Sequence, residues 1–131
     1  MKQEAKALVE NAASRRIAQL RKQDPSLEVS YTMDENFPRA VIKLMKEKKV
    51  TWLEFVESSV TVGDASNLED YAFCAQEFGG LTLLFPESLY PRDIAATIFN
   101  DIKERIGGAG YPEVELNGYV YDDLGNLKRA F

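Results

Sequence analysis

Four carboxylates in the last part of the chain are the residues whose type and spacing are best suited to chemistry. They are Glu113, Glu115, Asp122 and Asp123. Paired carboxylates bind hard cations or share the roles of general acid and general base. A hairpin turn at Asn117-Gly118 would bring Glu113 near Asp122. Because the segment lacks the regular oxygen-ligand spacing of a calcium loop, we expect these side chains to be solvated surface residues.

Histidine is absent from the chain, and its absence limits the catalytic mechanisms and metal sites that the chain can form. The usual general base near neutral pH and the commonest zinc ligand are both missing. The single cysteine, Cys74, has neither a histidine to activate it nor a second cysteine for a disulfide. We therefore expect a buried thiol, no metal site and no cofactor. The sequence leans against an enzyme, with carboxylate-based chemistry as the remaining enzymatic alternative.

Basic residues gather in the first part of the chain. Residues 1–49 carry eleven Lys and Arg against seven Asp and Glu, a balance of +4, whereas residues 50–131 carry five against fourteen, a balance of −9. Either the two halves interleave in space, or they form two faces with different partners. An ordinary solvated surface is the simpler interpretation of the basic side chains. The alternative is a basic surface for nucleic acid or an acidic protein, formed by Arg15, Arg16, Arg21, Lys22, Arg39, Lys43, Lys46, Lys48 and Lys49.

The bulk composition predicts one soluble globular domain over residues 1–131. A length of 131 residues, 45% hydrophobic content and 28% charged content are typical of such a domain, and the formal net charge is −5. No apolar stretch is long enough for a membrane span, and no apolar block follows the polar first residues as in a secretory signal. We therefore expect a cytoplasmic protein with no membrane partner.

Hydrophobic periodicity predicts helices and strands along most of the chain. A helical stripe spans residues 4–23, and strict alternation predicts a strand over 27–33. Further helices are expected over residues 38–49, 51–60, 67–78 and 91–106, with Gly79 ending the third of these. The apolar run 81–85, bounded by Gly80 and Pro86, predicts a buried strand.

The segment from Lys43 to Val60 resembles the first two helices of many helix-turn-helix domains. Its basic stretch Lys46-Glu47-Lys48-Lys49 is followed at once by Thr51-Trp52-Leu53-Glu54, which has the spacing of a helix-capping box. The resemblance implies a recognition helix that reads DNA. The expected helices over 51–60 and 67–78 contain acidic residues and no Lys or Arg, so the phosphates of DNA would repel them.

The last nineteen residues predict a three-stranded meander. A two-residue turn at Asn117-Gly118 would pair Leu116 with Tyr119, and a second turn at Gly125 would place Leu127 opposite Tyr121. The run Tyr119-Val120-Tyr121-Asp122, followed after two residues by Gly125-Asn126-Leu127, is similar to one unit of the tyrosine-aspartate repeats that build the shells of large bacterial toxins. For a single copy, this resemblance implies a hairpin and no function.

Together these elements predict an α+β domain. We expect a mostly antiparallel sheet of four or five strands, ending in the three-stranded meander, with about five helices on one side. Tyrosines along an uncovered outer strand would suit a partner interface or a sheet edge that pairs with another copy. The aromatic residues concerned are Tyr31, Tyr119, Tyr121 and Phe131.

The sequence favours a function in protein–protein interaction. Small acidic proteins with no catalytic constellation are often inhibitors, immunity proteins, accessory proteins or subunits. A protein partner is expected, with a homo-oligomer formed through a sheet edge as one form of it. Nucleic-acid binding or helix-turn-helix-like regulation by the basic part of the chain is the alternative, and an enzyme is the third.

Overall fold

The computed structural model describes residues 2–130 of the chain. Helix α1 (Lys2–Gln23) comes first and is followed by the strands β1 (Glu28–Met33), β2 (Ala40–Lys46) and β3 (Lys49–Val56). Helix α2 (Asn67–Phe78), strand β4 (Gly80–Pro86) and helix α3 (Arg92–Gly108) come next. Strands β5 (Glu115–Tyr121) and β6 (Leu127–Arg129) complete the described part.

The strands form one mixed sheet in the order β1-β2-β3-β4-β5-β6. Strands β3, β4 and β5 run parallel, and the remaining neighbours are antiparallel. The molecule is α+β, but the expected sheet of four or five mostly antiparallel strands is wrong. The expectation of about five helices is also wrong, since residues 2–130 form three.

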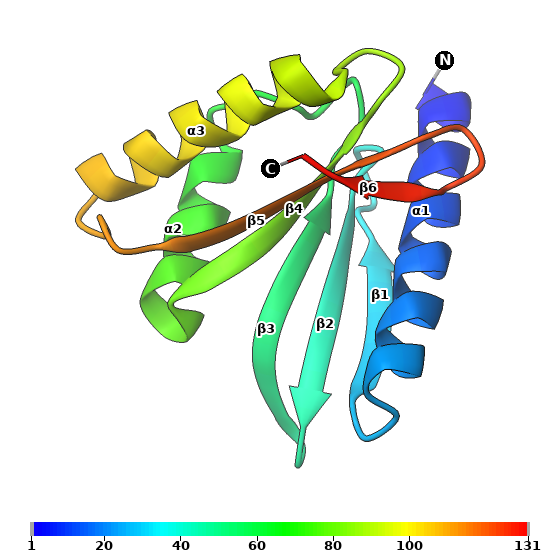
Figure 1. Ribbon diagram of the computed structural model, residues 1–131, viewed down its shortest axis with the longest axis horizontal. Coiled ribbons are helices and arrows are strands. Elements are labelled where there is room, and N and C mark those ends of the chain that lie inside the picture. The colour runs from blue at the N-terminus through cyan, green and yellow to red at the C-terminus, as the bar shows by residue number, and fades with distance from the viewer. Residues whose placement is uncertain (1, 131) are drawn as a thin grey trace.

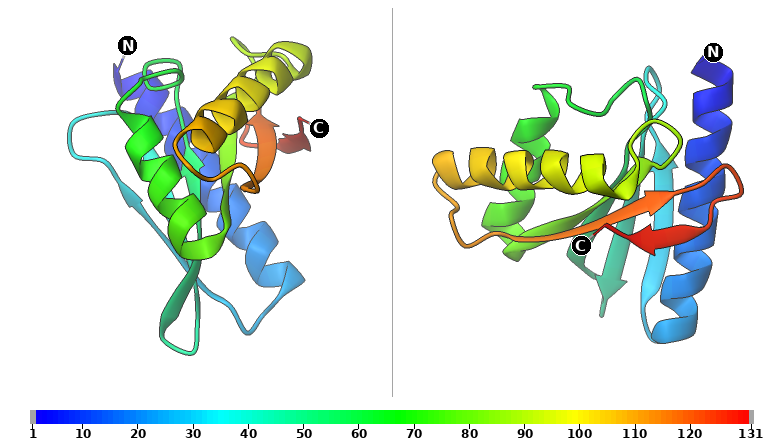
Figure 2. Two further views of the ribbon diagram at one scale, coloured as in Figure 1. Left: turned by 90° about the vertical axis from the view of Figure 1, so that its left-hand side faces the viewer. Right: turned by 45° about the horizontal axis from the view of Figure 1, so that its top comes forward.

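The helices lie on both faces of the sheet (Figures 1 and 2). On one face, Val9 and Ile17 of α1 pack in a cluster with Ile42 of β2 and Val56 of β3. Helices α2 and α3 share the other face, because the crossovers β3-α2-β4 and β4-α3-β5 advance the same way along the sheet with one hand. The expectation of helices on one side only is therefore wrong. Strand β4 lies between the two helical layers, and all seven of its residues are buried.

The elements with one clear periodicity are confirmed. The stripe of α1 is buried, and α2 spans the expected residues and ends at Gly79 with a φ of 80°. The strands expected over 27–33 and 81–85 are β1 and β4, and the helix expected over 91–106 is α3. Ile94 departs from the expected apolar face of α3, because its side chain is exposed.

The two helices expected between residues 38 and 60 are wrong, and the resemblance to a helix-turn-helix domain fails with them. This segment forms the antiparallel strands β2 and β3, with Lys46 paired to Lys49 across a two-residue turn. Both turn residues have positive φ, 52° at Glu47 and 66° at Lys48, as a type I′ turn requires. Neither is Gly or Asn, the residues usual there, so the sequence carries no recognisable turn signal.

The predicted meander is also wrong at its first turn. Asn117 and Gly118 do not turn the chain but lie within β5, paired with Thr82 and Leu83 of the parallel strand β4. The second turn is confirmed, since Tyr121 pairs with Leu127. In that turn the carboxylate of Asp122 accepts backbone N–H groups, and Gly125 has a φ of 82°. The hairpin implied by the tyrosine-aspartate resemblance is therefore present between β5 and β6.

We expect Glu47→Asn and Lys48→Gly to stabilise the protein, because both native side chains occupy left-handed backbone. Together they should raise the free energy of unfolding by about 1 kcal/mol, measured by urea denaturation with circular dichroism. A Lys103→Gly control at an exposed position inside α3 should lower it by about 1 kcal/mol. If the free energy of unfolding fell equally in the turn variant and the control variant, the native side chains at the turn would not be strained.

Candidate functional site

A buried carboxylate lies at the point where β3 ends. Glu57 follows Val56, the last residue of β3, and has no solvent exposure. Arg39 comes immediately before β2. Because Ala40 of β2 pairs with Val56, the hairpin register places Arg39 and Glu57 side by side. Two charged residues far apart in the sequence therefore meet in the interior.

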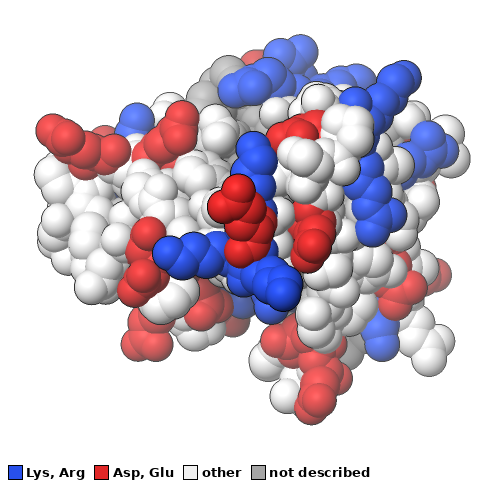
Figure 3. All heavy atoms as spheres, turned by 90° about the horizontal axis from the view of Figure 1, so that it is seen from below, with Lys and Arg blue, Asp and Glu red and all other residues white. Residues whose placement is uncertain are grey.

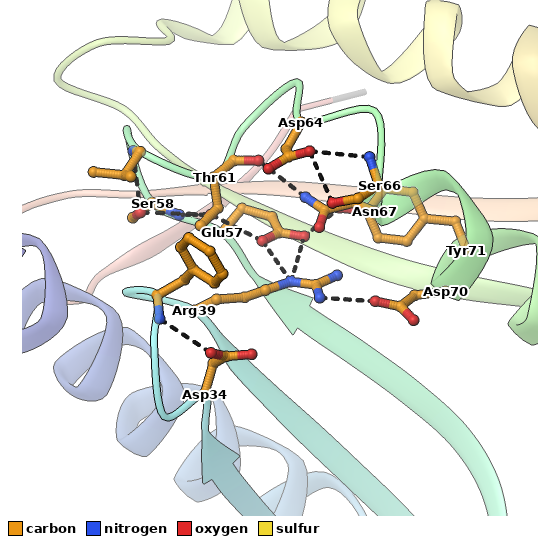
Figure 4. Close-up of polar contacts among 12 residues, drawn as sticks. Asp34, Arg39, Glu57, Ser58, Thr61, Asp64, Ser66, Asn67, Asp70 and Tyr71 are labelled. Carbon is orange, nitrogen blue, oxygen red and sulfur yellow. Dashed lines mark hydrogen bonds and ion pairs between the residues drawn. The ribbon is translucent and has the colours of Figure 1, made fainter.

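The Glu57 carboxylate is surrounded by donors from three segments (Figure 4). Arg39 Nε donates to both of its oxygens, at 2.8 and 3.1 Å. Thr61 Oγ1 donates to it at 3.0 Å, and the hydroxyl of Tyr71, from α2, donates to its second oxygen. Arg39 Nη1 also donates to Asp70 of α2, at 2.8 Å. We call these five residues the Glu57 cluster.

The Glu57 cluster fixes the loop between β3 and α2 in one conformation. The Ser58 backbone N–H donates to Thr61 Oγ1 at 2.9 Å, and that of Val60 donates to Ser58 Oγ at 3.1 Å. Asn67 Nδ2 donates to the carbonyl oxygen of Thr61 at 2.9 Å. The Tyr121 hydroxyl donates to the carbonyl oxygen of Glu57 at 2.6 Å, which joins the loop to β5.

Burial sets the protonation behaviour of the Glu57 cluster. It raises the pKa of the Glu57 carboxyl, because desolvation penalises the anion more than Arg39 and Tyr71 stabilise it. Burial also raises the pKa of Tyr71, further increased by the charge of Glu57. Burial disfavours the Arg39 cation, but Glu57 and Asp70 outweigh it and raise the pKa of that guanidinium. Tyr71 is thus a poor nucleophile, and the inaccessible Glu57 is placed to hold the fold rather than to contact a substrate.

Two hollows that share the lining residue Ser88 lie beside this framework. The first, of about 320 Å³, is lined by Glu4, Ala5, Leu8, Ser58, Ser59, Val60, Pro86, Ser88, Leu89 and Tyr121. The second, of about 400 Å³, shares Ser88 and is lined by Glu87, Ser88, Asp122, Asp123 and Leu124. We call both together the loop-end groove, because it lies where the loops after β3, β4 and β5 meet the first turns of α1 (Figure 1). Sequence reasoning gave no indication of it.

Three aliphatic side chains project from the loops around this groove. Val60 is 49% exposed, Leu89 is 58% exposed and Leu124 is 66% exposed. They come from the loops after β3, β4 and β5, respectively. Since parallel strands end at the same side of a sheet, their connections bring these side chains to one end of the molecule.

A second cavity, of about 350 Å³, lies between α2 and α3. Its apolar walls include Leu68, Ile98 and Ile102. The polar groups at its border already bind one another: Asp64 accepts from Ser66 at 2.8 Å, and Arg105 donates to Asp101 at 2.9 Å. The arrangement stabilises the helix termini and offers no converging set of free donors or acceptors.

Arg16, Arg39 and Tyr121 are buried, although the sequence placed all three among the candidate binding residues. The Arg16 guanidinium binds the Glu54 carboxylate through two hydrogen bonds, 2.6 Å from Nε and 2.8 Å from Nη2. It also lies over the ring of Tyr119, 4.6 Å from the centroid. Tyr119 and Tyr121 belong to β5, an inner strand between β4 and β6, so the expected row of tyrosines on an uncovered outer strand is wrong for them. Tyr31 does lie on the edge strand β1, and Phe131 falls outside the described residues.

The other basic candidates remain exposed. Arg15 lies on α1 against the β5–β6 loop, where a Cβ at Gly125 would come within 2.9 Å of its Cγ. Lys43 lies inside β2, and the rest occur where α1 ends and where the β2–β3 hairpin turns. These two regions are joined by the ion pair of Lys46 with Asp24 at 3.5 Å. This basic end contains Arg21, Lys22, Lys46, Lys48 and Lys49.

Figure 3 views the molecule from this lower end. Basic side chains gather on the right, along α1, and acidic side chains gather on the left, below α2 and α3, with both signs between them. The charge asymmetry of the sequence therefore survives folding in part. Arg21 is not entirely free, because its Nη2 donates to the carbonyl oxygen of Val29 on β1 at 2.9 Å.

The carboxylates expected to lie together are separated. Glu115 begins β5 and Asp122 follows its end, so Glu113 does not approach Asp122. Among residues 2–130, no group of three or more Cys, Asp and Glu side chains is arranged to hold a metal ion. Cys74 is buried as expected, and burial raises the pKa of its thiol to about 12. No helix in the described part of the chain is long and apolar enough to span a bilayer.

Comparison with known proteins assigns no family. The chain matches no protein-family model, and no curated protein shows significant similarity to it.

We expect that removing only one partner of the Arg16–Glu54 pair lowers the stability of the protein more than removing both. Glu54→Ala should lower the free energy of unfolding by about 3–5 kcal/mol, because the buried guanidinium loses its partner. Arg16→Met combined with Glu54→Leu should lose much less in urea denaturation, since neither charge remains. Asp101→Ala, which breaks the exposed pair with Arg105, should change stability little. A double variant as unstable as Glu54→Ala would contradict this account.

The Glu57 carboxyl should make stability fall with rising pH. Because its pKa is raised in the folded state, its contribution is fully present below the ordinary glutamate pKa and is lost as pH rises through the folded-state pKa. The free energy of unfolding of the wild type minus that of Glu57→Gln should therefore decrease above about pH 4. Its slope is at most about 1.4 kcal/mol per pH unit in urea titrations. A difference that increases with pH would mean that Arg39 outweighs burial.

Proposed function

We propose that this protein acts by binding another protein. The observation that carries the proposal is the gathering of Val60, Leu89 and Leu124, all about half exposed or more, around one groove. Single exposed aliphatic side chains are common on protein surfaces, whereas groups of them typically mark interaction sites. An inhibitor, an immunity protein, an accessory protein and a subunit would all use such a surface.

The rigidity of the surroundings supports the same proposal. The Glu57 cluster fixes the loop that carries Val60, and the Tyr121 hydroxyl joins that loop to β5. The Glu87 backbone N–H donates to the carbonyl oxygen of Tyr121 at 2.8 Å, which ties the next loop to the same strand. Preformed surfaces lose little conformational entropy on association, so the apolar contact contributes more to affinity.

Nucleic-acid binding is the second candidate. It is favoured by the meeting of α1 and the β2–β3 hairpin at the basic end, where Lys46 pairs with Asp24, two residues after Lys22. Such a site would act through phosphate contacts, and its affinity would fall steeply with salt. Glu47 and Asp24 at the same end reduce the attraction, so we rank this function below protein binding.

Affinity purification from the cells that produce the protein tests the two candidates together. We expect mass spectrometry to identify a protein partner that is retained after nuclease treatment, because the proposed contact is partly apolar. An unrelated acidic protein of similar net charge serves as the control bait.

Recovery of no protein above the level of that control would contradict the proposal. Recovery of nucleic acid that is lost as salt rises from about 50 to about 200 mM would favour the second candidate. In that case Lys48→Glu with Lys49→Glu should abolish the recovery, and Lys103→Glu on α3 should not.

A further inference from the structure

The loop-end groove combines apolar walls with an acidic border. Its apolar residues come from α1, from the end of β4 and from the three loops that follow the parallel strands. They are Ala5, Leu8, Val60, Pro86, Leu89 and Leu124. This composition, an apolar floor with polar edges, is the one found in protein interfaces.

Among the side chains that the structure describes, carboxylates outnumber cations along the border of the groove. Glu4 lies at its α1 side, and Glu87, Asp122 and Asp123 lie at the side of the later loops. Two cations that the structure describes near it are Lys128, which pairs with Glu87 at 3.2 Å, and Arg15, which lies against Gly125. The border therefore attracts positive charge toward the apolar floor.

We propose that the loop-end groove binds an amphipathic helix of a partner protein, with aliphatic residues on its buried face and Lys or Arg beside them. This inference rests on the proposed protein-binding function and assigns to it a surface and a partner chemistry. The helix would place residues at i, i+3 or i+4 and i+7 against Leu8, Val60, Leu89 and Leu124.

The construction of the groove favours a helical partner over an extended one. Its walls are a helix, three loops and the last residues of β4 and β5, and no residue of the edge strands β1 and β6 lines either hollow. An added strand needs a free edge for its backbone hydrogen bonds. A polyproline segment docks on exposed aromatic side chains, whereas the aromatic residue here, Tyr121, is buried and bonded to Glu57.

Charge distinguishes a basic partner from the two other occupants of apolar grooves. In a symmetric pair of copies joined through this groove, the carboxylates at the border of one copy would face those of the other and repel them. An anionic membrane surface would be repelled by Glu4, Glu87, Asp122 and Asp123. A helix with Lys or Arg beside its apolar face can contact the apolar residues of the groove and pair with the carboxylates at its border.

Labelled model peptides test the proposal even before the natural partner is identified. The probe is a fluorescein-labelled helix of about 18 residues of Leu and Lys, with Leu at i, i+3, i+4 and i+7. One control peptide has the same composition in an order that forms no apolar face, and another replaces every Lys by Glu. Fluorescence anisotropy at about 150 mM salt measures affinity, and chemical-shift changes of backbone amides locate the bound peptide.

Matched variants separate the groove from the rest of the surface. Val60→Ser with Leu89→Ser removes apolar contacts without changing charge and should weaken binding at least about tenfold. Ile94→Ser, at a similarly exposed aliphatic residue on α3, should leave affinity within about twofold. Glu4→Gln with Asp123→Asn should weaken binding more at low salt, whereas Glu69→Gln with Glu104→Gln on α2 and α3 should not.

The proposal is supported if the Leu/Lys helix binds at least about tenfold more tightly than both control peptides and the shifts map to the groove. Three results would overturn the proposal. They are equal binding of the reordered Leu/Lys peptide, preference for the Leu/Glu helix, and unchanged affinity in Val60→Ser with Leu89→Ser. A dimer in sedimentation that the same double variant dissociates would assign the groove to a second copy instead. A captured protein partner that the double variant still binds would leave the proposed function standing and show this inference to be wrong.

Discussion

The carboxylate of Glu57 is buried where β3 ends, and a buried charge costs several kcal/mol unless it is paired and hydrogen-bonded. Three donors pair with this carboxylate, and all three must be in position together. They are Arg39 before β2, Thr61 in the loop after β3 and Tyr71 on α2. The Tyr121 hydroxyl reaches the backbone of the same residue from β5. The loop between β3 and α2 can therefore adopt few other conformations. The side chains that this loop contributes to the loop-end groove are held in place as a result.

The amphipathic helices could be predicted from the sequence, because their apolar residues follow one period only. The segment from 38 to 60 follows two periods at once. Val41, Leu44 and Met45 fit a helical stripe, while Ala40, Ile42 and Leu44 alternate on a strand and are the residues buried under α1. Glu47 and Lys48 turn the hairpin with positive φ but without Gly or Asn, so nothing local decided between the two patterns. The β pairing with β1 and β4 decides it, and such pairing cannot be seen in a local pattern.

The error at Asn117-Gly118 and the failure to predict the Glu57 cluster both concern long-range pairing. Asn-Gly is a strong hairpin signal, yet here it lies in a strand whose backbone is held on both sides by β4 and β6. Arg39 and Glu57 looked like surface residues because charged side chains usually are. The alignment of Ala40 with Val56 would have placed them together, but that register depends on a hairpin the sequence did not reveal. The exposed aliphatic residues of three separate loops gather for the same reason.

Helix α1 contacts strand β5, although the two are far apart in the sequence. This separation matters during synthesis of the chain. Arg16 of α1 lies over the ring of Tyr119, and Tyr121 belongs to the cluster that contains Val9 and Ile17. On the ribosome, α1 can pack on β1, β2 and β3 soon after it emerges, whereas its contacts with Tyr119 and Tyr121 must wait for residues 115–121. Contacts of such long sequence separation form slowly and leave the unfinished chain open to aggregation. Nascent chains would thus become fully resistant to proteases only after β5 has emerged, even though α1 and the first three strands can associate earlier.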